Sequence, residues 1–142
     1  MQLKLERSII VAEIVIDSSV WIEYFRGNPD FKEALHHLLQ HDAMVTLSII
    51  QAELIQGFHN AKEATYVLSL MQQAKQVSEK TTDWIEAAWT ANRLRKKGIT
   101  VPLSDCYIAY QTQKHGLQLW TIDKHFEQIK TDIKLKLYAA TV

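Results

Sequence analysis

The chain has 142 residues, the length of one ordinary domain, and 47% of them are apolar, enough for a core without disulfides or a structural metal. Charged residues make up 23%, with only four glycines and two prolines, which excludes disordered and collagen-like chains. The 16 basic and 16 acidic side chains balance, which argues against a protein that holds nucleic acid through its overall charge. We therefore expect a single domain over 1–142.

Cellular location is constrained by the cysteine content and by the hydropathy of the chain. Cys106 is the only cysteine, so an internal disulfide and a zinc ribbon are excluded, and the reducing cytoplasm is favoured. No apolar run approaches the roughly 18 residues of a membrane span. We expect a cytoplasmic protein with no membrane partner.

The first predicted elements alternate between strand and helix. Residues 8–16 form an Ile- and Val-rich run that ends at Asp17 and is typical of a strand buried on both faces. Ser18 or Ser19 can cap the helix that follows, which stops before Pro29. The next elements are predicted to be a helix from residue 30, a strand over 43–47, and helices over 48–59 and 61–74.

Two polar patterns predict further helix starts. Ser48 with Gln51, and Asp83 with Glu86, have the spacing of a capping box. The remaining elements are predicted to be a short strand at 76–77, helices over 83–97, 105–114 and 126–129, and strands over 117–122 and 133–138. This alternation predicts an α/β sandwich with a mainly parallel central sheet.

Four acidic residues lie where a role in solubility explains them poorly: Asp17, Glu53, Asp105 and Asp123. An aspartate beside a helix start is often a cap, so none of them is specific alone. However, sites in parallel sheets lie beyond the carboxyl ends of strands, where Asp17 and Asp123 are predicted. Carboxylates about 4 Å apart repel by roughly 4 kcal/mol at an effective dielectric of about 20, so such a cluster needs protons or a cation. Oxygen ligands suit Mg²⁺ or Mn²⁺ rather than zinc, as in nucleases, phosphatases and polymerases.

Four segments carry a resemblance to a known family, in the family's order and spacing over 16–137. They are IDSSVWI at 16–22, LSIIQAEL at 47–54, GITVPLSDCYIA at 98–109 and LWTIDKHF at 119–126. In these segments the sequence resembles the PIN-domain nucleases, and specifically the VapC toxins of toxin–antitoxin pairs. The resemblance implies a PIN-like three-layer α/β/α sandwich and a Mg²⁺-dependent endoribonuclease, with Mn²⁺ as a substitute.

The resemblance also implies residue roles and partners. The catalytic residues would be the four acids, of which Asp17, Asp105 and Asp123 would hold the metal and Glu53 would complete the shell or orient the attacking water. Thr121 or Ser18 would support the site by hydrogen bonding. The implied partners are an RNA substrate, a VapB-like antitoxin and a second copy of the chain in a homodimer.

The sequence departs from the family pattern at two places. His125 stands where many relatives have a further acid, which would weaken a second metal site and could place the imidazole on a phosphate. The first acid also comes late, at Asp17, so residues 1–9 are either an N-terminal extension or the product of an upstream start.

Basic side chains gather in the last third of the chain. Residues 91–142 hold nine basic and four acidic side chains, against seven and twelve in residues 1–90. A basic cluster is formed by Arg93, Arg95, Lys96 and Lys97. It is either an RNA-binding surface beside the site or a solvated helix end, where the helix dipole favours positive charge.

Two further questions stay open at the level of sequence. Five aromatic residues have the spacing of core residues, although some could form a partner-binding or dimer face: Trp21, Tyr24, Phe25, Trp84 and Trp89. The alternative to an enzyme is a catalytically weak PIN-like module that binds RNA or protein, which the intact set of four acids disfavours. A dehalogenase-type phosphatase is also disfavoured, because its second aspartate is replaced by Ser19.

Overall fold

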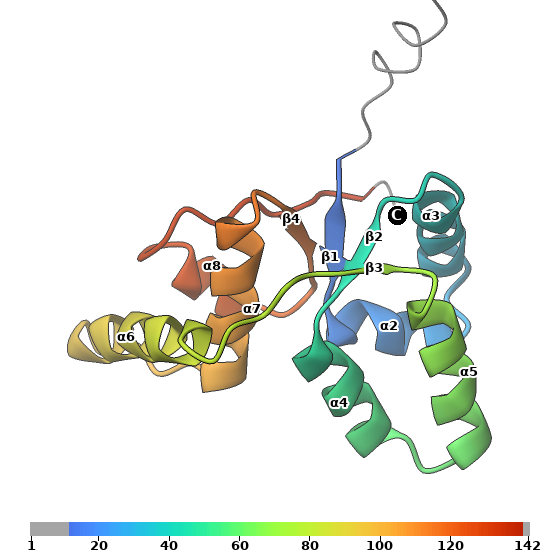
Figure 1. The fold of residues 1–142 in the computed structure, drawn as a ribbon, viewed down its shortest axis with the longest axis horizontal. Helices are drawn as coiled ribbons and strands as arrows, with labels where there is room; N and C mark the ends of the chain where they lie inside the picture. The colour runs from blue at the N-terminus through green and yellow to red at the C-terminus, as the bar shows by residue number, and fades with distance from the viewer. Residues whose placement is uncertain (1–11, 141–142) are drawn as a thin grey trace, which may run out of the picture.

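A parallel sheet forms the centre of residues 12–140, which are the residues that the computed structural model describes (Figure 1). Its strands are β1 (Ile14–Ile16), β2 (Met44–Thr46), β3 (Lys75–Gln76) and β4 (Gln118–Trp120), in the order β3-β2-β1-β4. β1 pairs in parallel with both β2 and β4, so that Val15 lies opposite Val45 and Leu119. The predicted parallel sheet is confirmed, and the strands that precede Asp17 and Asp123 are neighbours.

The β1 strand is central because its sequence leaves no polar face. Ile14, Val15 and Ile16 are all buried. Successive side chains of a strand point to opposite faces, so each face of β1 presents apolar groups to a helical layer. Full burial of each contributes about 1.5–3 kcal/mol. The first part of the strand predicted over 8–16, and the proposed extension over 1–9, lie outside the described residues.

Helices cover both faces of the sheet. Among residues 12–140 they are α2 (Ser18–Phe25), α3 (Pro29–Gln40), α4 (Ser48–Gly57), α5 (Ala61–Met71), α6 (Asp83–Lys96), α7 (Leu103–Lys114) and α8 (His125–Ile129). Figure 1 shows α2, α3 and α5 on one side of the strands and α6, α7 and α8 on the other. This is the expected three-layer α/β/α sandwich. None of the helices in the described part of the chain is long and apolar enough to cross a membrane.

The predicted last strand over 133–138 is not a regular strand. The backbone after α8 first completes the helix, with the Ile133 amide donating to the Ile129 carbonyl at 3.3 Å. It then reaches the sheet at one isolated bridge between Leu137 and Leu119. The Tyr138 amide donates to Leu119 at 2.7 Å and the Leu119 amide donates to Lys136 at 2.9 Å. The segment therefore covers the outer edge of β4 over a few residues only.

Neither predicted capping box forms, because distant side chains take its place. The amide and hydroxyl of Ser48 donate to the carboxylate of Glu79, at 3.1 and 2.9 Å, instead of pairing with Gln51. Asp83 is buried and accepts hydrogen bonds from the Lys80 amide and from the side chains of Gln111 and Lys114. These tertiary contacts tie the loop between β3 and α6 to α4 and α7.

The aromatic residues divide between the core and the surface. Trp21 and Tyr24 are buried and Phe25 packs against the core, as predicted. Trp84 and Trp89 are instead 37% and 54% exposed on α6. Cys106 is fully buried in α7, as a small core residue.

Candidate active site

The carboxylate of Asp17 lies where β1 ends and α2 begins. Asp17 is only 3% exposed, and its Oδ2 accepts hydrogen bonds from the hydroxyls of Ser19, at 2.7 Å, and Thr121, at 2.8 Å. Burial raises the pKa of Asp17 and outweighs these hydrogen bonds, which lower it. The side chain is thus held in one orientation in a place that disfavours its charge.

The segment after β4 is held beside Asp17 by hydrogen bonds. Thr121 Oγ1, which donates to Asp17, accepts a hydrogen bond of 3.0 Å from the Asp123 amide. The Ile122 amide donates to Ser19 Oγ at 3.2 Å. Because β4 neighbours β1, this network places Asp123 beside Asp17, although the two residues are far apart in the sequence.

Asp105 enters the site from the first turn of α7. It is 8% exposed, because the helix packs its following residues, Cys106 to Ala109, into the core. Burial, and then the negative charge of Asp17, raise the pKa of Asp105 to about 6 despite its contact with His125. Its Oδ2 lies 3.1 Å from Nδ1 of His125.

Glu53 completes the acidic group from the middle of α4. Its side chain is half-buried, and its Oε1 is enclosed without a hydrogen-bond partner among residues 12–140. Burial and the charges of the three aspartates raise the pKa of Glu53 to about 7. The structure therefore brings together all four acids predicted from the sequence.

His125 stands between two of these acids. Its Nδ1 lies 3.1 Å from Asp105 Oδ2 and 3.2 Å from Asp123 Oδ1, and its amide donates to Asp123 Oδ1 at 2.9 Å. One ligand atom from each of the three residues lies within 4.8 Å of the other two. The imidazole expected to reach RNA is thus part of the acidic cluster itself.

This donor set fits a divalent cation. The oxygen atoms of four carboxylates converge from β1, α4, α7 and the end of β4, with an enclosed Glu53 oxygen that lacks a partner within the described region. Raised carboxylate pKa values are the expected result where negative groups repel and no cation offsets them. A hard cation among oxygen donors would remove this repulsion.

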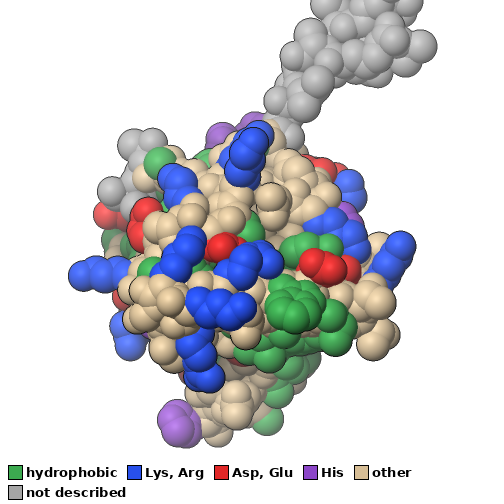
Figure 2. Space-filling view, turned by 90° about the vertical axis from the view of Figure 1, so that its left-hand side faces the viewer, with side chains coloured by type: hydrophobic (Ala, Val, Ile, Leu, Met, Phe, Trp, Pro, Cys, Tyr) green, Lys and Arg blue, Asp and Glu red, His purple; other side chains and the backbone are tan. Residues whose placement is uncertain are grey.

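The four candidate RNA-binding residues at the end of α6 differ in their contacts. The Arg93 side chain binds Asp132, with Nη2 to Oδ2 at 3.0 Å, and Lys97 Nζ lies 3.8 Å from the same carboxylate. Arg95 and Lys96 are exposed. Figure 2 shows Lys and Arg side chains gathered on the face seen from this side, next to a hydrophobic patch.

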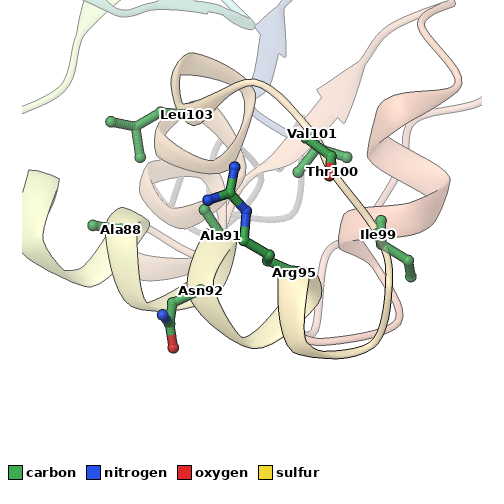
Figure 3. A pocket seen from close by; sticks show the side chains of 8 residues that line it. All are labelled: Ala88, Ala91, Asn92, Arg95, Ile99, Thr100, Val101 and Leu103. Atoms are coloured by element: carbon green, nitrogen blue, oxygen red, sulfur yellow. The ribbon is translucent and has the colours of Figure 1, made fainter.

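Arg95 lies along an open groove of about 410 Å³ between α6 and the segment that leads to α7. The groove is lined by Ala88, Ala91, Asn92, Arg95, Ile99, Thr100, Val101 and Leu103 (Figure 3). Figure 3 shows the Arg95 guanidinium reaching over the groove between Ala91 and Leu103. The groove ends at Leu103 in the first turn of α7, and none of the four acids lines it.

Sequence reasoning missed two sets of supporting residues. The sequence predicts Thr121 or Ser18 as the support; Thr121 does bind Asp17, but the second hydroxyl on this carboxylate belongs to Ser19. The short spacing from Asp17 to Ser19 could have indicated this contact. The link between Glu79 and Ser48 spans 31 positions, and no local pattern signals it.

Comparison with solved structures finds the same fold. VapBC-1 from nontypeable Haemophilus influenzae is 23% identical with a TM-score of 0.71, over 91% of this chain and 98% of that chain. A DNA-bound VapBC from Salmonella typhimurium is 18% identical with a TM-score of 0.71, over 90% and 98%. A toxin-antitoxin complex from Klebsiella pneumoniae is 16% identical with a TM-score of 0.63, over 79% and 88%.

Comparison at the level of sequence gives the family. No curated protein sequence matches the chain. A family model described as PIN domain matches residues 14–131, which include all four acids and most of the chain. This protein belongs to the PIN domain family, a family of nucleases.

Proposed function

We propose that the protein is a metal-dependent endoribonuclease that uses Mg²⁺ or Mn²⁺ and is the toxin of a VapBC-type toxin–antitoxin pair. The observation that carries the proposal is the convergence of Asp17, Glu53, Asp105 and Asp123 at one corner of the sheet, where the pKa values of Asp17, Glu53 and Asp105 are raised and one Glu53 oxygen is enclosed. Such a group is costly in a protein that does not bind a cation, because each carboxylate disfavours the charge of the others.

Each acid has its own role in this proposal. Asp17, Asp105 and Asp123 hold the cation, and Thr121 and Ser19 keep Asp17 in the required orientation. When bound, a divalent cation supplies positive charge to the scissile phosphate and lowers the pKa of an attacking water. Glu53, whose Oε1 has no hydrogen-bond partner within residues 12–140, orients that water for in-line attack. The products would carry a 5′-phosphate and a 3′-hydroxyl.

The proposed partners follow from the solved structures that share this fold. Two of them are VapBC assemblies, and another is described as a toxin-antitoxin complex. We therefore expect a VapB-like antitoxin that blocks the acidic site, a homodimer of this chain, and action in the cytoplasm. The exposed Trp84 and Trp89 on α6 provide aromatic surface of the kind that is enriched at interfaces.

Metal dependence of RNA cleavage tests the proposed activity. Purified protein is freed of metal with a chelator and incubated with single-stranded RNA, alone and after addition of Mg²⁺ or Mn²⁺. We expect cleavage only after metal is returned, with phosphate at the new 5′ ends. Cleavage that persists in excess chelator, or a protein that binds RNA without cutting it under any of these conditions, would reject the proposal and favour a binding module.

A further inference from the structure

The imidazole of His125 occupies a place that an oxygen ligand would take in an all-carboxylate site. Nδ1 lies 3.1 Å from Asp105 Oδ2 and 3.2 Å from Asp123 Oδ1. An octahedral ion with ligands at about 2.1–2.2 Å separates adjacent ligand atoms by about 3.0–3.1 Å. The two distances from Nδ1 therefore match adjacent ligands of one ion.

The fold holds the His125 ring in this position. His125 is the first residue of α8, and its amide is fixed by Asp123 Oδ1 at 2.9 Å. The next turn of the helix is anchored by Phe126 and Ile129, which are both fully buried. The backbone of His125 is consequently fixed beside Asp123, and its side chain, which is 42% exposed, reaches both aspartates from there.

Ligand chemistry distinguishes the ions that such a site accepts. Carboxylate and water oxygens suit Mg²⁺, whereas imidazole nitrogen suits transition metals. Mn²⁺ accepts both kinds of donor, so one nitrogen among carboxylates favours it over Mg²⁺. Mn²⁺ also tolerates departures from ideal geometry, whereas Mg²⁺ demands a near-ideal octahedron.

We propose that His125 Nδ1 is a direct ligand of the catalytic cation, together with Asp105 and Asp123, and that it makes the site prefer Mn²⁺ to Mg²⁺. The inference rests on the proposed function, because it concerns the metal of that same site. It assigns to His125 a role other than phosphate contact, and it makes this residue the determinant of metal preference.

Pulsed electron paramagnetic resonance of bound Mn²⁺ tests the ligand directly, without reference to activity. We expect the electron spin-echo modulation of ¹⁴N from one imidazole in the unmodified protein, replaced by the ¹⁵N pattern when the histidines are ¹⁵N-labelled. The His125→Ala variant should still bind Mn²⁺ but lose this modulation. His59→Ala, at an exposed histidine after α4, is the matched control and should keep it.

Metal competition tests the preference. Replacing His125 with Asp restores an all-oxygen site, and we expect the ratio of Mn²⁺ to Mg²⁺ affinity to fall at least tenfold, measured by displacement of Mn²⁺ with Mg²⁺. An unchanged ratio would overturn the proposed role of His125 in metal preference.

The outcomes separate this inference from the proposed function. Mn²⁺ that binds the unmodified protein and is lost in Asp105→Asn, but shows no nitrogen modulation, overturns the role of His125 and leaves the acidic metal site intact. Failure of the unmodified protein to bind Mn²⁺ or Mg²⁺ at all overturns both.

Discussion

The hydroxyl of Tyr107 donates a hydrogen bond of 2.6 Å to Glu79, whose carboxylate also accepts from the amide and hydroxyl of Ser48. Tyr107 follows Asp105 in α7, and Ser48 begins the helix that carries Glu53. One carboxylate from a loop thus joins the N-terminal parts of two helices that each bring an acid to the site. This contact fixes the position of α4 relative to α7 from outside the metal cluster.

Replacing Glu79 with Gln should weaken this link. Glutamine has one acceptor oxygen where glutamate has two, so either the Ser48 amide or the hydroxyls of Ser48 and Tyr107 lose their acceptor. The helix start also loses a favourable negative charge. We expect the free energy of unfolding to fall by about 1 kcal/mol. Urea unfolding measures it, with Glu33→Gln on the exposed face of α3 as the control. Equal stability of the two variants would show that Glu79 does not hold the helices together.

The stability of the metal-free protein should pass through a maximum at mildly acidic pH. Burial raises the pKa of Glu53 from 4.5 to about 7 and that of Asp105 from 3.8 to about 6. The stability that these groups contribute is therefore fully present below about pH 4 and is lost as pH rises from there to about 7. Asp83 behaves in the opposite way. Burial raises its pKa, but hydrogen bonds from Lys114, the Lys80 amide and Gln111 outweigh burial and lower the pKa to about 2.

The stabilisation by Asp83 is therefore present above its unfolded pKa of 3.8 and is lost as pH falls toward 2. We expect the melting temperature without metal to be highest near pH 4, where the unfolded pKa values of Asp83 and Asp105 lie, and to fall as pH rises toward 7. Added Mn²⁺ should raise the melting temperature more at pH 8 than at pH 5, because the carboxylates are then charged. Thermal unfolding at each pH checks both statements, and a metal effect that is larger at pH 5 would contradict them.

Replacing Glu53 with Gln should make the metal-free protein more stable and the enzyme inactive. The change removes a charge that folding places beside three aspartates. Because the side chain is only half-buried, solvent screening limits the gain at pH 8 to about 1 kcal/mol. Denaturant unfolding and RNA cleavage measured on one preparation would show the opposite changes. A variant that loses stability would indicate that Glu53 is a structural residue.

Arg95 should contribute to RNA affinity more than Arg93 does. The Arg95 side chain is exposed and lies over an open groove, whereas Arg93 is bound to Asp132. In Asp17→Asn protein, which we expect to leave RNA intact, Arg95→Gln should lower the slope of log affinity against log salt by about 0.7, the effect of one lost contact to a single strand. Arg93→Gln, the paired comparison, should leave the slope nearly unchanged. The reverse order of effects would place RNA elsewhere on the surface.

The sequence was sufficient to predict the residues whose position depends on topology alone. Asp17 and Asp123 follow strands of a parallel sheet, so the carboxyl ends of neighbouring strands bring them together whatever the details of packing. Local patterns could not predict the capping contacts at places where a residue distant in the sequence competes for the same hydrogen bonds. Ser48 has the spacing of a capping residue, yet the carboxylate of Glu79 takes over its amide and hydroxyl.

Side-chain direction was equally inaccessible from the sequence. Nothing in the order of residues indicates that the His125 ring turns toward Asp105 rather than toward solvent, since this depends on how Phe126 and Ile129 set the rotation of α8. The last segment was predicted to be a strand from its apolar residues. A backbone hydrogen bond that ends α8 at Ile133 instead keeps the first residues of this segment away from the sheet.

RNA cleavage by the Asp17→Asn variant tests the central claim most directly, because Asn keeps the shape of the side chain while removing its charge. Asp17→Asn and the control Glu33→Gln are compared with the unmodified protein at equal concentration with Mn²⁺, after circular dichroism has shown that all three are folded. We predict that the control cleaves normally and that Asp17→Asn loses at least 99% of the activity, which corresponds to a change of about 2.7 kcal/mol or more in the barrier. Normal cleavage by folded Asp17→Asn would contradict the assignment of the four acids as the catalytic site.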